Sequence, residues 1–187
     1  MNAKLILFSN HIEWQASNNV LIGTLQQLQL MADPLPNRDD HYRSGERFME
    51  QLTFVGCSPF IALQPEEAKA DQTYCAIHLP QQKNHYYSAV DSMSTAPRCP
   101  HCRKAHPTWQ TDLQQWHKDQ TQRWSCSVCE KTSAPWEWNW RKQAAFGRSV
   151  IEVLNIHPHE AIPSQALLDA LHALNQTPWQ YAYVREA

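Results

Sequence analysis

Four of the six cysteines in this 187-residue chain stand in two closely spaced pairs. Cys99-Pro-His-Cys102 is followed, after 23 intervening residues, by Cys126-Ser-Val-Cys129. A Cys-x-x-Cys pair makes a tight turn that points two thiolates the same way, and backbone N–H groups of the turn can donate to the sulfurs. Two such turns supply four soft ligands at about 2.3 Å from a zinc ion. The spacing therefore predicts a closed tetrahedral Zn2+ site on Cys99, Cys102, Cys126 and Cys129, with no position left for water.

The segment around these cysteines, about residues 97–141, resembles a zinc ribbon. The resemblance implies a small β-rich unit held by metal, and it implies no activity, because ribbons serve nucleic-acid-binding, protein-binding and purely structural roles. The segment departs from the familiar pattern at Arg103 and Glu130, which stand where glycine usually follows the second cysteine of each pair. The whole chain also resembles an uncharacterised bacterial family, and this resemblance implies no function.

Other chemistries fit part of the cysteine pattern. Cys-Pro-His-Cys is also the active-site sequence of DsbA-type thiol oxidoreductases, in which Cys99 and Cys102 would form a redox pair at a helix N-terminus, directly after a buried strand. Polar residues 91–98 stand in place of that strand. His11-Ile12-Glu13 matches half of the zinc deaminase pattern, but neither cysteine pair follows a proline. Four thiolates also accept iron, and two disulfides would suit a secreted chain, for which we find no signal.

Tryptophan is unusually frequent, with eight residues, six of them between Trp109 and Trp140. Trp136, Trp138 and Trp140 alternate with polar residues, which predicts a strand with all three rings on one face. Such a face would either stack nucleic-acid bases or cover the sheet and join the cysteine segment to the rest of the protein. We favour the second interpretation.

The formal net charge of −2 is an average over three unlike segments. Residues 1–97 carry −4, residues 98–142 carry +4 and residues 143–187 carry −2. Zinc held by four thiolates would lower the middle value to +2, which is modest for a phosphate-binding patch. The near-neutral total also argues against a polybasic membrane binder. The basic residues of the middle segment are Arg98, Arg103, Lys104, Lys118, Arg123, Lys131, Arg141 and Lys142.

Several histidines and the two remaining cysteines are weaker candidates. His101, His106 and His117 could replace a cysteine as zinc ligand, but with four cysteines present we expect them at the surface. Cys57 and Cys75 lie among small or apolar residues, where we expect buried, unreactive thiols.

One further histidine-containing sequence follows an apolar run. His157-Pro-His159-Glu160 could hold a metal or supply a base, yet it reads equally as a polar turn, which we favour. No serine-nucleophile elbow, phosphate loop, dinucleotide fingerprint or zinc-protease sequence occurs.

The hydrophobic pattern predicts an α+β fold. Strands are expected at residues 4–8, 60–63, 74–79, 136–140, 150–156 and 181–184, with 60–63 and 74–79 antiparallel across the polar loop 65–73. One helix would bury Leu21, Leu25 and Leu28 and end at Pro34 and Pro36. A second would start at Asp39-Asp40, bury Phe48, Leu52 and Val55, and end before Gly56. A third, with Pro163 in its first turn, would bury Leu167, Leu168, Leu171 and Leu174.

These elements suggest a mixed or antiparallel sheet with about three helices and an inserted zinc-ribbon subdomain. Residues 1–97 would form the N-terminal part, residues 98–142 the ribbon, and residues 143–187 a β-α-β part that completes the α+β core. Both flanks are short for an independent core, which favours one joint core.

The expected function is binding, without catalysis. No apolar run is long enough to span a bilayer and no signal peptide is evident, so we expect a cytoplasmic protein of bacterial type. A protein partner, and thus an adaptor role, is the first hypothesis. Nucleic-acid binding is the alternative, and thiol–disulfide exchange through Cys99 and Cys102 comes third. The oligomeric state stays open.

Overall fold

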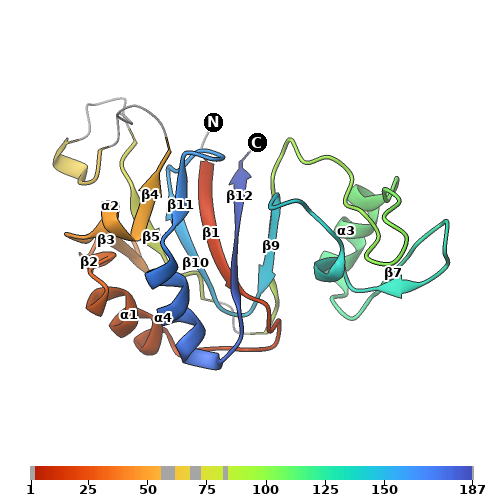
Figure 1. Ribbon diagram of the computed structural model, residues 1–187, viewed down its shortest axis with the longest axis horizontal. Coiled ribbons are helices and arrows are strands. Elements are labelled where there is room, and N and C mark those ends of the chain that lie inside the picture. Colours follow the sequence, from red (N-terminus) through yellow and green to blue (C-terminus); the bar gives the residue numbers. More distant parts are fainter. Residues whose placement is uncertain (1–2, 56–61, 68–72, 82–83, 187) are drawn as a thin grey trace.

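The computed structural model describes residues 3–55, 62–67, 73–81 and 84–186 (Figure 1). Its centre is a six-stranded sheet with the order β12-β1-β10-β5-β3-β2, in which all neighbours are antiparallel. The first and last strands of the chain lie side by side in it. The strands are β1 (Ala3–Ser9), β2 (Met31–Pro34), β3 (His41–Ser44), β5 (Ala76–His78), β10 (Val150–Leu154) and β12 (Trp179–Arg185).

The remaining elements are short strand pairs and helices, which together confirm the α+β class. The pairs are β4 (Leu52–Phe54) with β11 (Ala161–Pro163), β6 (Tyr87–Val90) with β9 (Ala144–Gly147), and β7 (Trp124–Ser125) with β8 (Thr132–Ser133). The helices are α1 (Asn18–Gln27), α2 (Phe48–Gln51), α3 (Trp109–Lys118) and α4 (Gln165–Asn175), with 3-10 turns η1 (Pro65–Glu67) and η2 (Pro135–Glu137). Within the described part of the chain, every helix falls short of the length and apolarity of a membrane span.

Alternation along the strands gives the main sheet two unlike faces. Leu5 and Leu7 of β1 point to the face covered by α1 and α4, while Lys4 and Ile6 point to the other. The helices bury Leu21, Leu25, Leu167 and Leu171 against the first face. Because this core draws on strands and helices from both ends of the chain, the two flanks share it.

The second face is covered in part by the β6–β9 pair. Tyr87 of β6 and Ala145 of β9 pack on Ile6, Ala182 and Val184 of β1 and β12. Between β6 and β9 the chain leaves the sheet and forms a unit that projects to the right in Figure 1. We call residues 98–142 the cysteine module.

Several predicted elements are confirmed. Strands occur at 4–8, 150–154 and 181–184, and α1 and α4 bury the expected leucines Leu21, Leu25, Leu167 and Leu171. Helix α4 begins two residues later than expected, because Pro163 belongs to β11. Ser164 then caps the helix by accepting a hydrogen bond from the Leu167 N–H at 3.1 Å.

Other predicted elements are wrong, mostly where short strands pair with distant ones. No helix starts at Asp39-Asp40, since residues 41–44 are hydrogen-bonded between β2 and β5 and only Phe48–Gln51 is helical. Val55, expected in that helix core, is 59% exposed, and Gly56 lies outside the described residues. Helix α1 ends at Gln27, before Pro34, which lies in β2.

Two further strand predictions fail in different ways. Phe60 and Ile61 lie outside the described residues, and Ala62 makes a single parallel bridge to Tyr74 where an antiparallel pair was expected. Residues 136–140 do not form a strand, because the 3-10 turn η2 starts at Pro135.

Candidate metal centre

The four cysteines predicted as ligands meet at one point in the cysteine module. The sulfurs of Cys99, Cys102, Cys126 and Cys129 all lie within 4.8 Å of one another. Cys99 Sγ lies 3.7 Å from Cys129 Sγ, and Cys102 Sγ lies 3.6 Å from Cys126 Sγ. A tetrahedron with metal–sulfur bonds of about 2.3 Å has sulfur–sulfur edges of about 3.8 Å. The cluster therefore has the dimensions of a site that could hold a metal ion such as zinc.

Each cysteine pair forms the same turn. In the first, the Arg103 N–H donates to the Cys99 carbonyl at 2.9 Å and the Cys99 N–H donates to the Lys104 carbonyl at 2.8 Å. The second repeats both bonds, from Glu130 N to the Cys126 carbonyl at 2.9 Å and from Cys126 N to the Lys131 carbonyl at 3.0 Å. Two turns of equal geometry, joined through their sulfurs, make the symmetric cradle that the spacing predicted.

Arg103 and Glu130, which replace the usual glycines, take up the glycine conformation. Their φ angles are 63° and 60°, in the left-handed region. For a residue with a Cβ, that conformation costs about 1–2 kcal/mol relative to the right-handed one. The turns thus keep their shape without glycine, at a conformational cost that the sulfur cluster must offset.

Backbone N–H groups set the charge of the sulfurs. Those of Cys129 and Val128 donate to Cys126 and lower the pKa of its thiol to about 6. At Cys102 the Lys104 N–H acts in the same direction, but burial and the neighbouring thiols outweigh it and raise the pKa to about 11. At neutral pH Cys126 is therefore mostly a thiolate, whereas Cys102 keeps its proton, which a divalent cation must displace to bind.

The tryptophans form the core around this cluster. Trp116, Trp124, Trp138 and Trp140 are buried, with Trp138 only 3% and Trp140 only 5% exposed. Trp140 packs on Phe146 of β9, with ring centroids 5.7 Å apart, and so joins the module to the sheet. The packing interpretation is confirmed for these rings, while Trp109 and Trp136 are half-buried.

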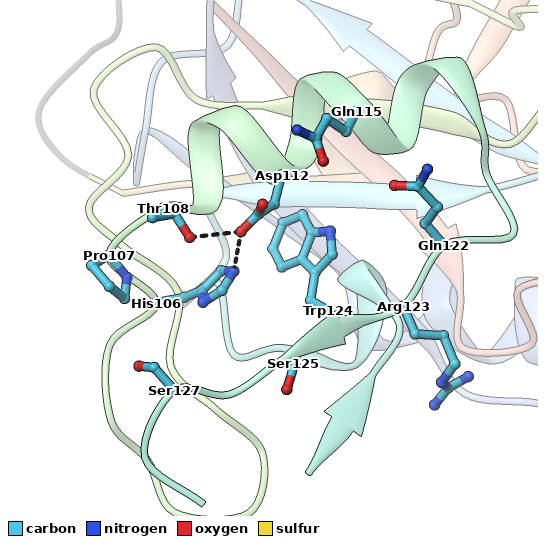
Figure 2. Close-up of a pocket in the computed structure, with 10 residues that line it drawn as sticks. All are labelled: His106, Pro107, Thr108, Asp112, Gln115, Gln122, Arg123, Trp124, Ser125 and Ser127. Carbon is cyan, nitrogen blue, oxygen red and sulfur yellow. Dashed lines mark hydrogen bonds and ion pairs between the residues drawn. The ribbon is translucent and has the colours of Figure 1, made fainter. Parts of the chain in front are cut away.

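His106 lies in the same aromatic core, beside the cavity of about 290 Å³ drawn in Figure 2. Its Nε2 lies 2.7 Å from Asp112 Oδ2 on α3, which also accepts from the Thr108 hydroxyl at 2.7 Å. Its ring stacks on Trp124 at a centroid distance of 5.1 Å and packs at a tilt against Trp138 at 4.6 Å. The predicted surface position is wrong for His106, which is 4% exposed. Through Asp112 it connects α3 to the segment that follows the first cysteine turn.

The rings of the other histidine candidates are not part of the sulfur cluster, although the His101 N–H donates to Cys99 Sγ at 3.4 Å. His101 and His117 are exposed, and His117 Nε2 lies 2.6 Å from the Ser88 hydroxyl. His157 belongs to the predicted turn, in which its N–H donates to Glu160 Oε2 at 2.8 Å. The cysteine cluster is the single His/Cys/Asp/Glu group of metal-binding dimensions among the residues described.

The alternative chemistries lack their geometry. A turn follows Cys99, and α3 begins only at Trp109, so no helix N-terminus activates the first thiol. Glu13, from the deaminase-like sequence, pairs with Arg148 at 3.1 Å, away from the cluster. Cys75 is 1% exposed and burial raises its pKa to about 12, which makes it the unreactive thiol we expected. Cys57 lies outside the described residues.

Comparison of the chain with protein-family models, with curated proteins and with solved structures finds no match. The zinc-ribbon resemblance therefore rests on the cysteine spacing alone, and no match supports the resemblance to a bacterial family. The four-cysteine cluster carries the functional argument by itself.

Proposed function

We propose that this is a zinc protein that acts by binding another protein, with the metal holding the binding module folded. The observation that carries the proposal is the closed sulfur cluster. Four thiols at tetrahedral spacing fill every coordination position, and zinc so bound has none left to activate water or substrate. Such a site contributes folding energy and no chemistry.

The module depends on metal because its regular structure is slight. Its strands β7 and β8 have two residues each, and α3 has ten. A unit of this size rarely folds on its hydrophobic core alone. The cluster links the turn before α3 to the turn between β7 and β8, and so fixes both ends of the aromatic core.

The surface around the cluster favours an acidic protein partner. Arg103 and Lys104 follow the first turn, Lys131 follows the second, and none has a carboxylate partner among the described residues. Val128, in the second turn, is 60% exposed, and the same turn also carries the exposed carboxylate Glu130. An exposed apolar side chain on turns that carry three cations and one carboxylate would suit a small interface whose partner surface is acidic.

The metal is tested first, by elemental analysis after metal-replete expression. We expect one zinc per chain, and less than about half an equivalent would contradict the proposal. Cys102→Ser should lose metal, whereas Cys75→Ser, which removes a thiol outside the cluster, should keep it. Equal zinc in both variants would place the metal elsewhere.

The binding role is tested with variants that keep the metal. Val128→Asp and Lys131→Glu reverse the character of the surface around the cluster without touching a sulfur. A protein captured by the zinc-loaded wild type and lost with both variants supports the proposal. Capture that is unchanged in both variants, or that survives chelation, contradicts it.

A second candidate is nucleic-acid binding, favoured by one cavity of about 490 Å³ beside the module. Its wall combines the half-buried rings of Tyr86 and Trp136, 5.3 Å apart, with Lys118 and Arg123. Aromatic rings beside cations are a stacking site for single-stranded nucleic acid. Affinity for short single-stranded and duplex oligonucleotides, measured against salt, decides: a linear fall of log affinity with log salt supports this role, and no binding at low salt removes it.

A further inference from the structure

A row of charged and polar side chains crosses the second face of the main sheet, far in sequence from the cysteines. Glu152 of β10 lies directly opposite His78 of β5, and His78 lies opposite His41 of β3. On the other side of Glu152, Ile6 of β1 is its direct partner, and Lys4, two residues away opposite Leu154, reaches Glu152 diagonally with its side chain. Three neighbouring strands thus place Glu152, His78 and His41 in one row, and Lys4 joins it from the next strand on the same face.

Glu152 is the buried centre of this row. Its Oε1 accepts from Lys4 Nζ at 2.6 Å and from the Tyr87 hydroxyl, and its Oε2 lies 2.7 Å from His78 Nδ1. Burial alone would raise the pKa of this carboxyl, but the hydrogen bonds from His78 and Lys4 lower it to about 2. With both oxygens occupied, Glu152 acts as an ionised group that orients its neighbours.

The two imidazoles are held in matching ways. His78 uses Nδ1 toward Glu152, and His41 Nδ1 lies 2.7 Å from the Asp39 carbonyl oxygen, an acceptor. Their rings stack with centroids 4.1 Å apart. Because a carboxylate or carbonyl at Nδ1 fixes the tautomer and the ring orientation, Nε2 of each ring is left for a further partner.

The row opens into a cavity of about 440 Å³, large enough for a small molecule. The cavity is lined by both histidines, Tyr87 and Arg38, and by Lys4 with the two carboxylates that it pairs with, Glu152 at 2.6 Å and Glu186 at 3.0 Å. Arg38 forms no ion pair within the described part of the chain, and its guanidinium lies 5.9 Å from the Tyr74 ring centroid. Arg38 is exposed at the cavity wall, where a guanidinium without an ion pair is suited to a planar or tetrahedral oxyanion.

A purely structural role explains this cluster poorly. The neighbouring positions on the same face are apolar, namely Ile6, Val150 and Val184. Burying an ion pair costs several kcal/mol per ion, and well-packed apolar residues are often as stable or more so. Ionised groups with shifted pKa values beside a cavity are typical of a functional site.

We propose that this cavity is a second site, independent of the cysteine cluster, that binds a small molecule carrying a carboxylate or phosphate group. Arg38 binds the oxyanion, and Nε2 of His78 and of His41 contact the rest of the ligand. Glu152 is a positioning residue, which sets the tautomer of His78 and the place of Lys4 and Tyr87 around the cavity.

The test uses the whole zinc-loaded protein, with inorganic phosphate and acetate as probes at constant ionic strength. Imidazole NMR signals of His41 and His78 report binding. We expect a saturable shift with at least one probe, and the stronger of the two identifies the oxyanion. Arg38→Gln should weaken the affinity for that probe by about tenfold or more, because it removes a charge-assisted contact. Arg47→Gln, which removes an exposed arginine paired with Glu50, should leave it unchanged.

The proposal is overturned if the His41 and His78 shifts rise linearly with the concentration of both probes, without saturation. It is also overturned if wild type and Arg38→Gln bind the probe with equal affinity. The role of Glu152 has its own readout, the ring-nitrogen shifts of His78. Glu152→Gln should change the tautomer balance of His78 but not that of His172, which lies on α4. An unchanged His78 tautomer refutes the positioning role, and should this variant fail to fold, the Arg38 comparison still decides the site.

Discussion

Replacing Glu152 by glutamine should make the protein less stable in a way that depends on pH. The substitution keeps the shape of the side chain and removes its charge from the contacts with Lys4, His78 and Tyr87. A pKa near 2 in place of the ordinary 4.5 corresponds to about 3 kcal/mol of stability, at about 1.4 kcal/mol for each pH unit. We therefore expect Glu152→Gln to lower the free energy of unfolding by about 3 kcal/mol at pH 7.

The sign of the pH dependence follows from the direction of the shift. Because folding lowers the pKa of Glu152, its contribution is complete above the unfolded pKa and is lost as the pH falls toward 2. The difference between wild type and Glu152→Gln should thus shrink between about pH 5 and pH 2. Urea unfolding at several pH values, followed by far-UV circular dichroism, measures this difference in stability. Acid would release metal from the thiolates in wild type and variant alike, so this effect cancels in the difference.

Exposed Glu46 supplies the matched control. Glu46→Gln removes the same charge from the surface and should track the wild type at every pH. Two results would refute the reasoning: a difference below about 1 kcal/mol between wild type and Glu152→Gln at pH 7, or a difference that stays constant down to pH 2.5.

Three further predictions concern the metal and the backbone. Chelation should abolish the near-UV circular dichroism of the buried tryptophans, with Trp116 0% exposed, and unchanged spectra would contradict a structural metal. Arg103→Gly and Glu130→Gly should each raise the stability of the metal-bound protein by about 0.5–1 kcal/mol, since both positions have positive φ; thermal melts that fall on both substitutions would contradict this. Gly45→Ala should cost about 2 kcal/mol or more, because its Cβ would lie 2.2 Å from the Gln29 carbonyl oxygen. A melting temperature within 2 °C of wild type, about 0.5 kcal/mol, would refute that clash.

The sequence predicted those elements whose signal is local. Val150–Ile156 and Tyr181–Val184 are apolar runs that become the inner strand β10 and the edge strand β12, and the spacing of Leu167 and Leu171 indicated α4 directly. The sulfur cluster was predictable for the same reason, since each turn is closed within six residues by its own hydrogen bonds. Here the residues that carry the structure are neighbours in the chain.

The failures lie where distant residues decide. His41–Ser44 is a strand because it is hydrogen-bonded to β2 on one side and to β5 on the other. No pattern within the segment itself indicates these partners. The tryptophans from Trp136 to Trp140 pack around the cysteine cluster, so their alternation does not indicate a strand. The Glu152 row was missed as well, although a single acid inside the apolar run Val150–Leu154 was a visible signal.

The hairpin β6–β9 ties the module to the second cavity. Val90 pairs with Ala144, so this hairpin closes a loop of 53 residues, and Tyr87, three residues before Val90, donates to Glu152. A flexible loop of that length costs about 2 kcal/mol more to close than a turn of about four residues. If a metal folds this loop, as we propose, the free energy of metal binding offsets most of that entropy cost. We therefore expect occupancy of the four sulfurs to stabilise Tyr87 in the cavity wall without any contact between the two places.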